Sequence, residues 1–178
     1  MPDQFPCEIG LKDGRRVFLR RLTEHDGPAL FDFFQRLPVG LRRLAWDNVE
    51  SREVVEGWAR EINYDTLLPI VGLDGSKIIA DATLHYRKRG PLRLVGRIRW
   101  FIDPEYRGQG MAANLAGRMI SVGRDNGLRH LSCLLAPRYE AYDVEALESR
   151  GFVSTPFPDY GTDPDGLPED LTYMVCKL

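Results

Sequence analysis

The segment Arg107-Gly108-Gln109-Gly110-Met111-Ala112 has the composition of a turn that can bind phosphate. It follows a run with strand character and precedes apolar residues at helical spacing. The first turn of a helix presents free N–H groups and the positive end of the helix dipole. Gly108 and Gly110 let the backbone approach a ligand, and Arg107 and Gln109 add donors. We expect a phosphate or diphosphate site here; the alternative is a turn that uses glycine for its geometry alone.

Two other phosphate-binding patterns do not fit the chain. The glycine spacing differs from GxGxxG, and no initial strand–helix–strand unit precedes the turn, which argues against a dinucleotide site. The chain has no GxxxxGK[ST] segment, so a nucleoside triphosphate site has no support.

The elements that must position this turn can be read from periodicity and turn residues. A hairpin is predicted over 8–22, because Asp13-Gly14 separates two short apolar runs. A helix is predicted from Thr23 to Leu37, where Pro38 stops it. The remaining predictions are helices over 51–62, 111–126 and 141–149, and strands over 67–73, 78–86, 92–102, 128–135, from 152, and 171–177. This order predicts an α+β fold, with about four helices around a mixed sheet.

Composition narrows the class of protein. The 178 residues suit one domain, and a net charge of -2 demands neither a nucleic acid nor an anionic membrane as partner. Three scattered cysteines without a CxxC pair fit a reducing compartment, and no His/Cys cluster predicts a metal site. The N-terminus lacks the features of a secretory signal, and no apolar run is long enough to span a membrane. We therefore expect a cytoplasmic protein.

The Arg-x-x-Gly-x-Ala spacing that begins at Arg107, preceded by Ile102-Asp103-Pro104-Glu105-Tyr106, resembles the acyl-CoA signature of the GNAT superfamily of N-acetyltransferases. The segment 141–152, which ends in Arg-Gly-Phe, resembles that family's second landmark. The resemblance covers nearly the whole chain. Residues 11–20 and 31–37 are also similar, more weakly, to the GNAT domain of bacterial protein-lysine acetyltransferases.

The resemblance implies a single GNAT domain over 1–178, with a central mixed and splayed sheet and the hairpin 8–22 at its start. It implies acetyl-CoA as the acyl donor, with its pantetheine arm bound by backbone groups of Trp100, Phe101 and Ile102. The diphosphate would bind at Arg107 and at the N–H groups of 108–112. The implied activity is N-acetyl transfer to a primary amine, on a small molecule or a protein lysine, by direct attack in a ternary complex. The protein would be a monomer or homodimer.

The chain departs from the family's pattern where protons are transferred. Arg97 stands where the protein-lysine relatives have a glutamate, and a guanidinium cannot act as the usual base. Leu147 stands where many members have a tyrosine, and Glu140 where an asparagine is frequent. These departures leave open a second interpretation, an acyl-CoA-binding regulatory or sensor domain with reduced catalysis.

Several side chains could serve the acceptor. Arg97 and Arg99 share one strand face, so they would either favour an anionic acceptor or form a solvated surface. Tyr142 could protonate the leaving thiolate, or it could be a packing tyrosine. His85 could relay a proton, or it could be an ordinary strand histidine.

Three further features have plainer interpretations. Cys133 is interpreted as a buried hydrophobe rather than an acyl-carrying nucleophile. The acidic segment 154–170 is expected to be a surface loop, with attraction of a basic acceptor as the alternative. The basic turn 87–89 is expected to be a hairpin tip, with contact to the 3′-phosphate of CoA as the alternative.

Overall fold

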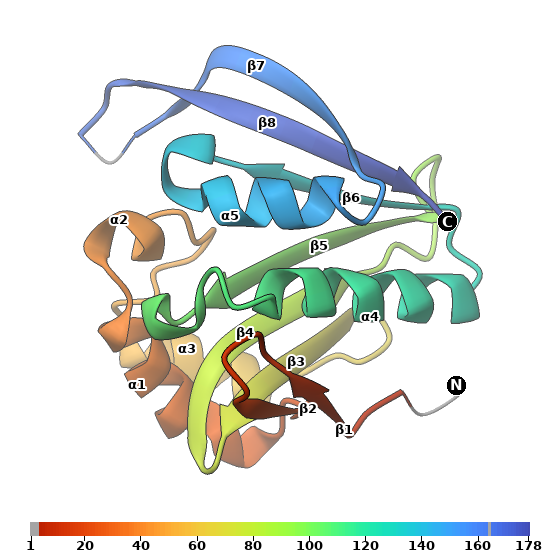
Figure 1. Ribbon diagram of the computed structural model, residues 1–178. Helices are drawn as coiled ribbons and strands as arrows, with labels where there is room; N and C mark the ends of the chain where they lie inside the picture. The colour runs from red at the N-terminus through yellow and green to blue at the C-terminus, as the bar shows by residue number, and fades with distance from the viewer. Residues whose placement is uncertain (1–3, 164) are drawn as a thin grey trace.

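The computed structural model describes residues 4–163 and 165–178, which form one mixed sheet with helices on both faces (Figure 1). The order of strands across the sheet is β1-β2-β3-β4-β5-β6-β8-β7. All neighbours are antiparallel except β5 and β6. The strands are β1 (Cys7–Gly10), β2 (Arg16–Arg21), β3 (Leu67–Asp74), β4 (Lys77–His85), β5 (Val95–Ile102), β6 (His130–Leu135), β7 (Val153–Thr162) and β8 (Pro168–Lys177).

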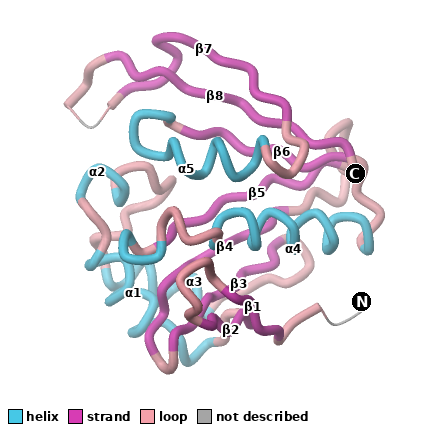
Figure 2. Tube along the Cα trace, viewed as in Figure 1, coloured by secondary structure: helices cyan, strands magenta, loops and turns pink. Residues whose placement is uncertain are grey.

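The helices divide between the two faces of the sheet (Figures 1 and 2). The helices are α1 (Gly27–Arg36), α2 (Val39–Arg42), α3 (Arg52–Arg60), α4 (Met111–Asp125) and α5 (Pro137–Glu148). Helices α4 and α5 cover one face, while α1 and α3 pack on the other.

The side chains of β5 alternate between two cores, one on each face of the sheet. Trp100 and Ile102 are buried with Met111 and Leu115 of α4. Phe101 is buried on the opposite face with Phe34 of α1, their ring centroids 5.5 Å apart. This alternation is the ordinary period of a strand. It fixes which β5 residues face α4 and α5 and which face α1 and α3.

The pairing of β5 with β6 ends after three register positions. Val95, Gly96 and Arg97 pair with 130–132, and within the described strands β5 has no further partner in β6. On its other side, β6 pairs with β8 along its whole length, from His130 to Leu135. The sheet is therefore splayed between β5 and β6, which confirms the predicted α+β fold with a splayed mixed sheet.

The order of predicted elements is confirmed, with two differences. The chain forms an extra one-turn helix, α2, directly after Pro38, which supplies no N–H and begins a new turn. The expected loop over 154–170 is wrong, because most of it forms the β7–β8 hairpin. The prolines at 156 and 158 are typical of loops and favoured the loop prediction. They are tolerated in this strand because β7 lies at the edge of the sheet.

None of the helices within residues 4–163 and 165–178 is long and apolar enough to cross a membrane. In the same part of the chain, no group of three or more His, Cys, Asp or Glu side chains is arranged to hold a metal ion.

Candidate active site

The glycine turn connects β5 to α4 as a backbone cradle. Gly108 and Gly110 have φ angles of 71° and 88°, a region that residues with a Cβ adopt at a cost, so glycine is needed at both positions. Gly110 is the N-cap of the 15-residue helix α4, so the free N–H groups of its first turn open beside the glycines.

The N-terminal hairpin braces this turn. The backbone N–H of Lys12 donates to the carbonyl of Gln109 at 3.0 Å. The Lys12 side chain passes 3.8 Å from the position that a Cβ at Gly110 would occupy. A cation therefore lies beside the glycines, contributed by a segment about a hundred residues away in the sequence. Sequence reasoning missed Lys12 because no local pattern connects the hairpin to the turn.

The register of β5 decides which of its backbone groups face the gap toward β6. The Asp103 N–H donates to Ile79 of β4 at 2.9 Å, and paired residues in an antiparallel ladder alternate in direction. Phe101, which pairs with Asp81, therefore directs its backbone groups to β4. Trp100 and Ile102 direct theirs to the gap. Of the three residues expected to bind the pantetheine arm, two are oriented toward the gap and Phe101 is not.

The Arg107 side chain contacts other residues of the protein. Its Nη1 donates to the carbonyl of Tyr139 at 3.0 Å, and its Nη2 lies 3.9 Å from Asp143. The Trp100 indole N–H also donates to Asp143, at 2.8 Å. Burial raises the pKa of Asp143 to about 6, against the lowering effect of the Trp100 bond. This cluster links α5 to β5 and engages the Arg107 guanidinium in contacts with α5.

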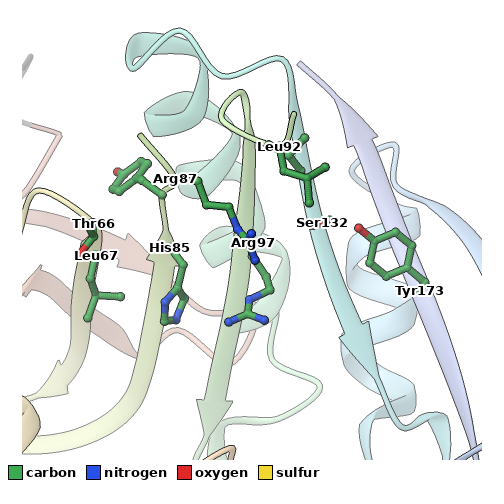
Figure 3. Close-up of a pocket in the computed structure, with 10 residues that line it drawn as sticks. Thr66, Leu67, His85, Arg87, Leu92, Arg97, Ser132 and Tyr173 are labelled. Atoms are coloured by element: carbon green, nitrogen blue, oxygen red, sulfur yellow. The ribbon is translucent and has the colours of Figure 1, made fainter. Parts of the chain in front are cut away.

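The opposite face of the sheet carries two adjoining cavities that share Leu67 and His85. One, of about 230 Å³, lies between the sheet and α1 and has aromatic walls that include Phe34, Trp58 and Phe101. The other, of about 530 Å³, lies over the paired ends of β5 and β6 (Figure 3). Both cavities open on the face away from α4, where an acceptor could approach the gap.

Asp81 is a carboxyl group on the wall of the smaller cavity. It is buried, and burial raises its pKa to about 7, because a charged carboxylate is poorly solvated there. A carboxyl with that pKa can both accept and release a proton near neutral pH. Sequence reasoning missed it; the available signal was a lone acid within the apolar strand Ile78-Ile79-Ala80-Asp81-Ala82.

Arg97 and Arg99 face the same side of the sheet, but their surroundings differ. Arg99 is buried in an ion pair with Glu140, so its charge is neutralised. Arg97 is exposed and stacks on the Trp46 ring, with its guanidinium carbon 3.7 Å from the ring centroid. The two arginines are therefore not equivalent: only Arg97 offers an unneutralised charge to a ligand.

His85 lies directly across from Arg97 in the β4–β5 register (Figure 3). The centroid of its ring is 5.4 Å from that of the Trp46 ring. Burial and, second, the charge of Arg97 lower its pKa to about 4. His85 is thus a neutral imidazole near pH 7, which can donate or accept a hydrogen bond but is a weak base.

The structure does not bring Tyr142 to this face. The Tyr142 side chain is 59% exposed, and its ring lies 3.9 Å from the position of a Cβ at Gly108, beside the glycine turn. Leu147 is fully buried in the core under α5. Cys133 is buried too, and burial raises the pKa of its thiol to about 12.

The fold is similar to that of solved acetyltransferase structures. The GNAT domain of S. lividans PAT superposes with a TM-score of 0.78 at 16% identity, covering 100% of this chain and 99% of that one. A GNAT-family acetyltransferase from Streptococcus pneumoniae gives 0.77 at 18% identity, covering 91% and 99%. A putative acetyltransferase from Salmonella typhimurium, solved with its cofactor acetyl-CoA, gives 0.74 at 18% identity, covering 91% and 94%.

The sequence itself carries the assignment to a family. No curated protein matches the sequence. The family model described as "Acetyltransferase (GNAT) domain" matches residues 16–142, a range that includes α1, the splayed strand β5, the glycine turn, α4 and β6. Because this range is well over half of the chain, the protein belongs to the GNAT acetyltransferase family.

Proposed function

We propose that this protein transfers an acetyl group from acetyl-CoA to a primary amine. The observation that carries the proposal is the unpaired length of β5 beyond Arg97, with backbone groups of Trp100 and Ile102 facing the gap. These groups suit the amides of a pantetheine arm, since a strand edge offers alternating donors and acceptors. The glycine turn, with the first N–H groups of α4 and the Lys12 ammonium, suits the diphosphate.

The acceptor would enter through the cavities on the opposite face, and the two substrates would meet in the gap. The amine nitrogen attacks the thioester carbon, the carbon–sulfur bond breaks, and CoA leaves as a thiolate. The backbone N–H of Trp100 is placed to stabilise the oxyanion of the tetrahedral intermediate. A thiol of ordinary pKa, about 8.5, leaves readily as a thiolate near neutral pH. The reaction therefore needs a base more than it needs an acid.

We assign the role of base to Asp81. It replaces the glutamate expected at position 97, and it is the carboxyl on the acceptor face whose pKa, about 7, suits proton transfer. Because β5 lies between Asp81 and the gap, the proton of the amine would reach its carboxylate through a water molecule. Glu140 is less suited because Arg99 and the Ala136 N–H already occupy its carboxylate oxygens.

The test is thiol release from acetyl-CoA with a panel of primary amines, alongside calorimetric titration of acetyl-CoA. Acetyl-CoA binding with turnover of at least one amine is the expected result. Clear binding without turnover of any amine would contradict the enzyme and favour an acyl-CoA sensor. Absence of binding would contradict both.

A further inference from the structure

We propose that the acceptor is a small primary amine that also carries an anionic group, a carboxylate or a phosphate, and that Arg97 and Arg87 bind this group. The proposal rests on the proposed acetyl transfer and specifies its acceptor. It is carried by the cavity of about 530 Å³ over the paired ends of β5 and β6 (Figure 3).

The polar side chains that line this cavity are either positively charged or uncharged. They are Thr66, His85, Arg87, Arg97, Ser132 and Tyr173, drawn from four strands (β4, β5, β6 and β8) and two connecting segments of the sheet. Tyr86 also lines it, and burial raises the pKa of its phenol to about 12, so it stays uncharged. Among the described lining residues none is acidic. The cavity therefore has a net positive wall, an arrangement that concentrates anions.

In the described part of the chain, the two guanidinium groups lack a protein counter-ion. Within residues 4–163 and 165–178, no carboxylate lies within ion-pair distance of Arg87 or Arg97. Asp65, which precedes Thr66, is already paired with Lys88 at 2.7 Å. The pKa of Arg97 is lowered by burial and by the charge of Arg87, as expected for like charges that face one space. An anionic ligand would relieve this repulsion.

The position of the cavity fits an acceptor rather than the nucleotide of CoA. Arg97 is the last residue of β5 that pairs with β6, so the cavity ends where the gap begins. The glycine turn lies at the other end of β5, beyond Ile102. Arg97 and Trp100 are three residues apart, which is about 10 Å along a strand. An acceptor of similar length would place its anion at Arg97 and its amine at the thioester.

Trp46 holds Arg97 in place for this role. Its ring stacks on the Arg97 guanidinium and also contacts His85, and it lines the smaller cavity beside Asp81. Stacking restricts the arginine side chain while leaving its N–H groups free for bidentate bonds to an oxyanion. Trp46 is a positioning residue in this arrangement.

The experiment compares acceptors of similar length that differ in their far end. The probes are ε-aminohexanoate, ω-aminopentyl phosphate, neutral ω-aminohexanol, cationic cadaverine and a lysine peptide. We expect kcat/KM for one or both anionic probes to exceed that for aminohexanol by about tenfold to hundredfold, the effect of a charged hydrogen bond. The ratio of the carboxylate probe to the phosphate probe identifies the anion.

Arg97→Gln should remove this preference, lowering kcat/KM for the anionic probes about tenfold to hundredfold relative to kcat/KM for aminohexanol measured on the same variant. Arg97→Lys should restore part of it. Arg89→Gln is the matched control, since it removes a charge from the same hairpin at an exposed residue that does not line the cavity. Equal turnover of neutral and anionic probes, or a lysine peptide preferred whether or not Arg97 is present, would overturn the proposal.

A binding measurement separates this proposal from the proposed function. Calorimetric titration with ε-acetamidohexanoate, in the presence of CoA, measures anion binding without catalysis. If no amine is acetylated but the wild type binds this compound and Arg97→Gln does not, the anion site stands and the transferase fails. If amines are acetylated but the compound binds both proteins alike, the anion site fails and the transferase stands.

Discussion

Arg99 and Glu140 form a buried ion pair that joins β5 to the first turn of α5 across the splayed gap. Arg99 donates from Nη1 to the Glu140 carboxylate, whose second oxygen accepts the Ala136 N–H at 2.9 Å. The two side chains are only 8% and 3% exposed. Glu140 takes a non-helical conformation, with φ of -127°, so that α5 bends where the pair forms. The gap is therefore held at a fixed width by a polar contact.

Breaking this pair should be costly. Glu140→Gln leaves the Arg99 guanidinium buried without a full counter-charge, and we expect it to lower the free energy of unfolding by about 3–5 kcal/mol. The measurement is urea unfolding at pH 7. Glu8→Gln is the control, because it breaks an exposed pair with Arg16 that is worth about 0–1 kcal/mol. A similar decrease in the free energy of unfolding of the two variants would show that the buried pair stabilises the fold no more than the exposed pair does.

The activity should depend on the ionisation of Asp81. With its pKa near 7, kcat/KM of the wild type should fall as the pH is lowered through that value, because the protonated carboxyl cannot accept a proton. Asp81→Asn should lower kcat about 10²–10⁴-fold and leave the KM for acetyl-CoA little changed. Asp65→Asn, at an exposed acid, should retain the wild-type profile. A wild-type profile in Asp81→Asn would assign the base elsewhere.

Asp81 should lower the free energy of unfolding at alkaline pH. The folded-state pKa of Asp81 lies above its usual 3.8, so its stability contribution is full below about pH 4 and is lost as pH rises through 7. Asp81→Asn removes the buried charge and should raise the free energy of unfolding at pH 8 by roughly 2–4 kcal/mol. At pH 4 the gain should vanish. Urea unfolding at both pH values checks the sign, and a gain that is independent of pH would contradict it.

The glycine turn should be sensitive to a single methyl group. Gly110→Ala places a Cβ on a residue with φ of 88°, which costs about 1–2 kcal/mol in the backbone. We expect the dissociation constant for acetyl-CoA to rise at least about tenfold, measured by calorimetry. Gly57→Ala is the matched control, because it lies in α3 with no atom within 4 Å of the new Cβ. It should stabilise the helix slightly and leave acetyl-CoA binding unchanged.

The donor side of the site could be predicted from sequence because its signals are local. The glycines, the strand before them and the helix after them are contiguous, and the proposed contacts with acetyl-CoA come from the backbone. The backbone groups of Phe101 were predicted to bind the pantetheine arm, but strand alternation directs them to β4. That alternation depends on register, which is set by pairing with β4 and is not visible in β5 alone.

The acceptor side could not be predicted in the same way, because it is assembled from distant segments. Arg99 and Glu140 are 41 residues apart in the sequence, and their pairing removes one of two arginines expected to attract an acceptor. Asp81 acquires its raised pKa only when α1 covers β4. The extension of β7 and β8 through 154–170 was not predicted, because the pairing of these two strands with each other outweighs the local preference of proline and glycine for loops.

Cys133 should take no part in the transfer. It is 2% exposed, and burial raises the pKa of its thiol to about 12, so it is not a nucleophilic thiolate near neutral pH. Cys133→Ala should therefore retain the wild-type kcat apart from a modest loss of stability. Initial rates at varied acetyl-CoA and amine should give intersecting lines, as expected for the proposed direct transfer. Parallel lines together with an acetylated protein in the absence of amine would instead show an acyl-enzyme intermediate.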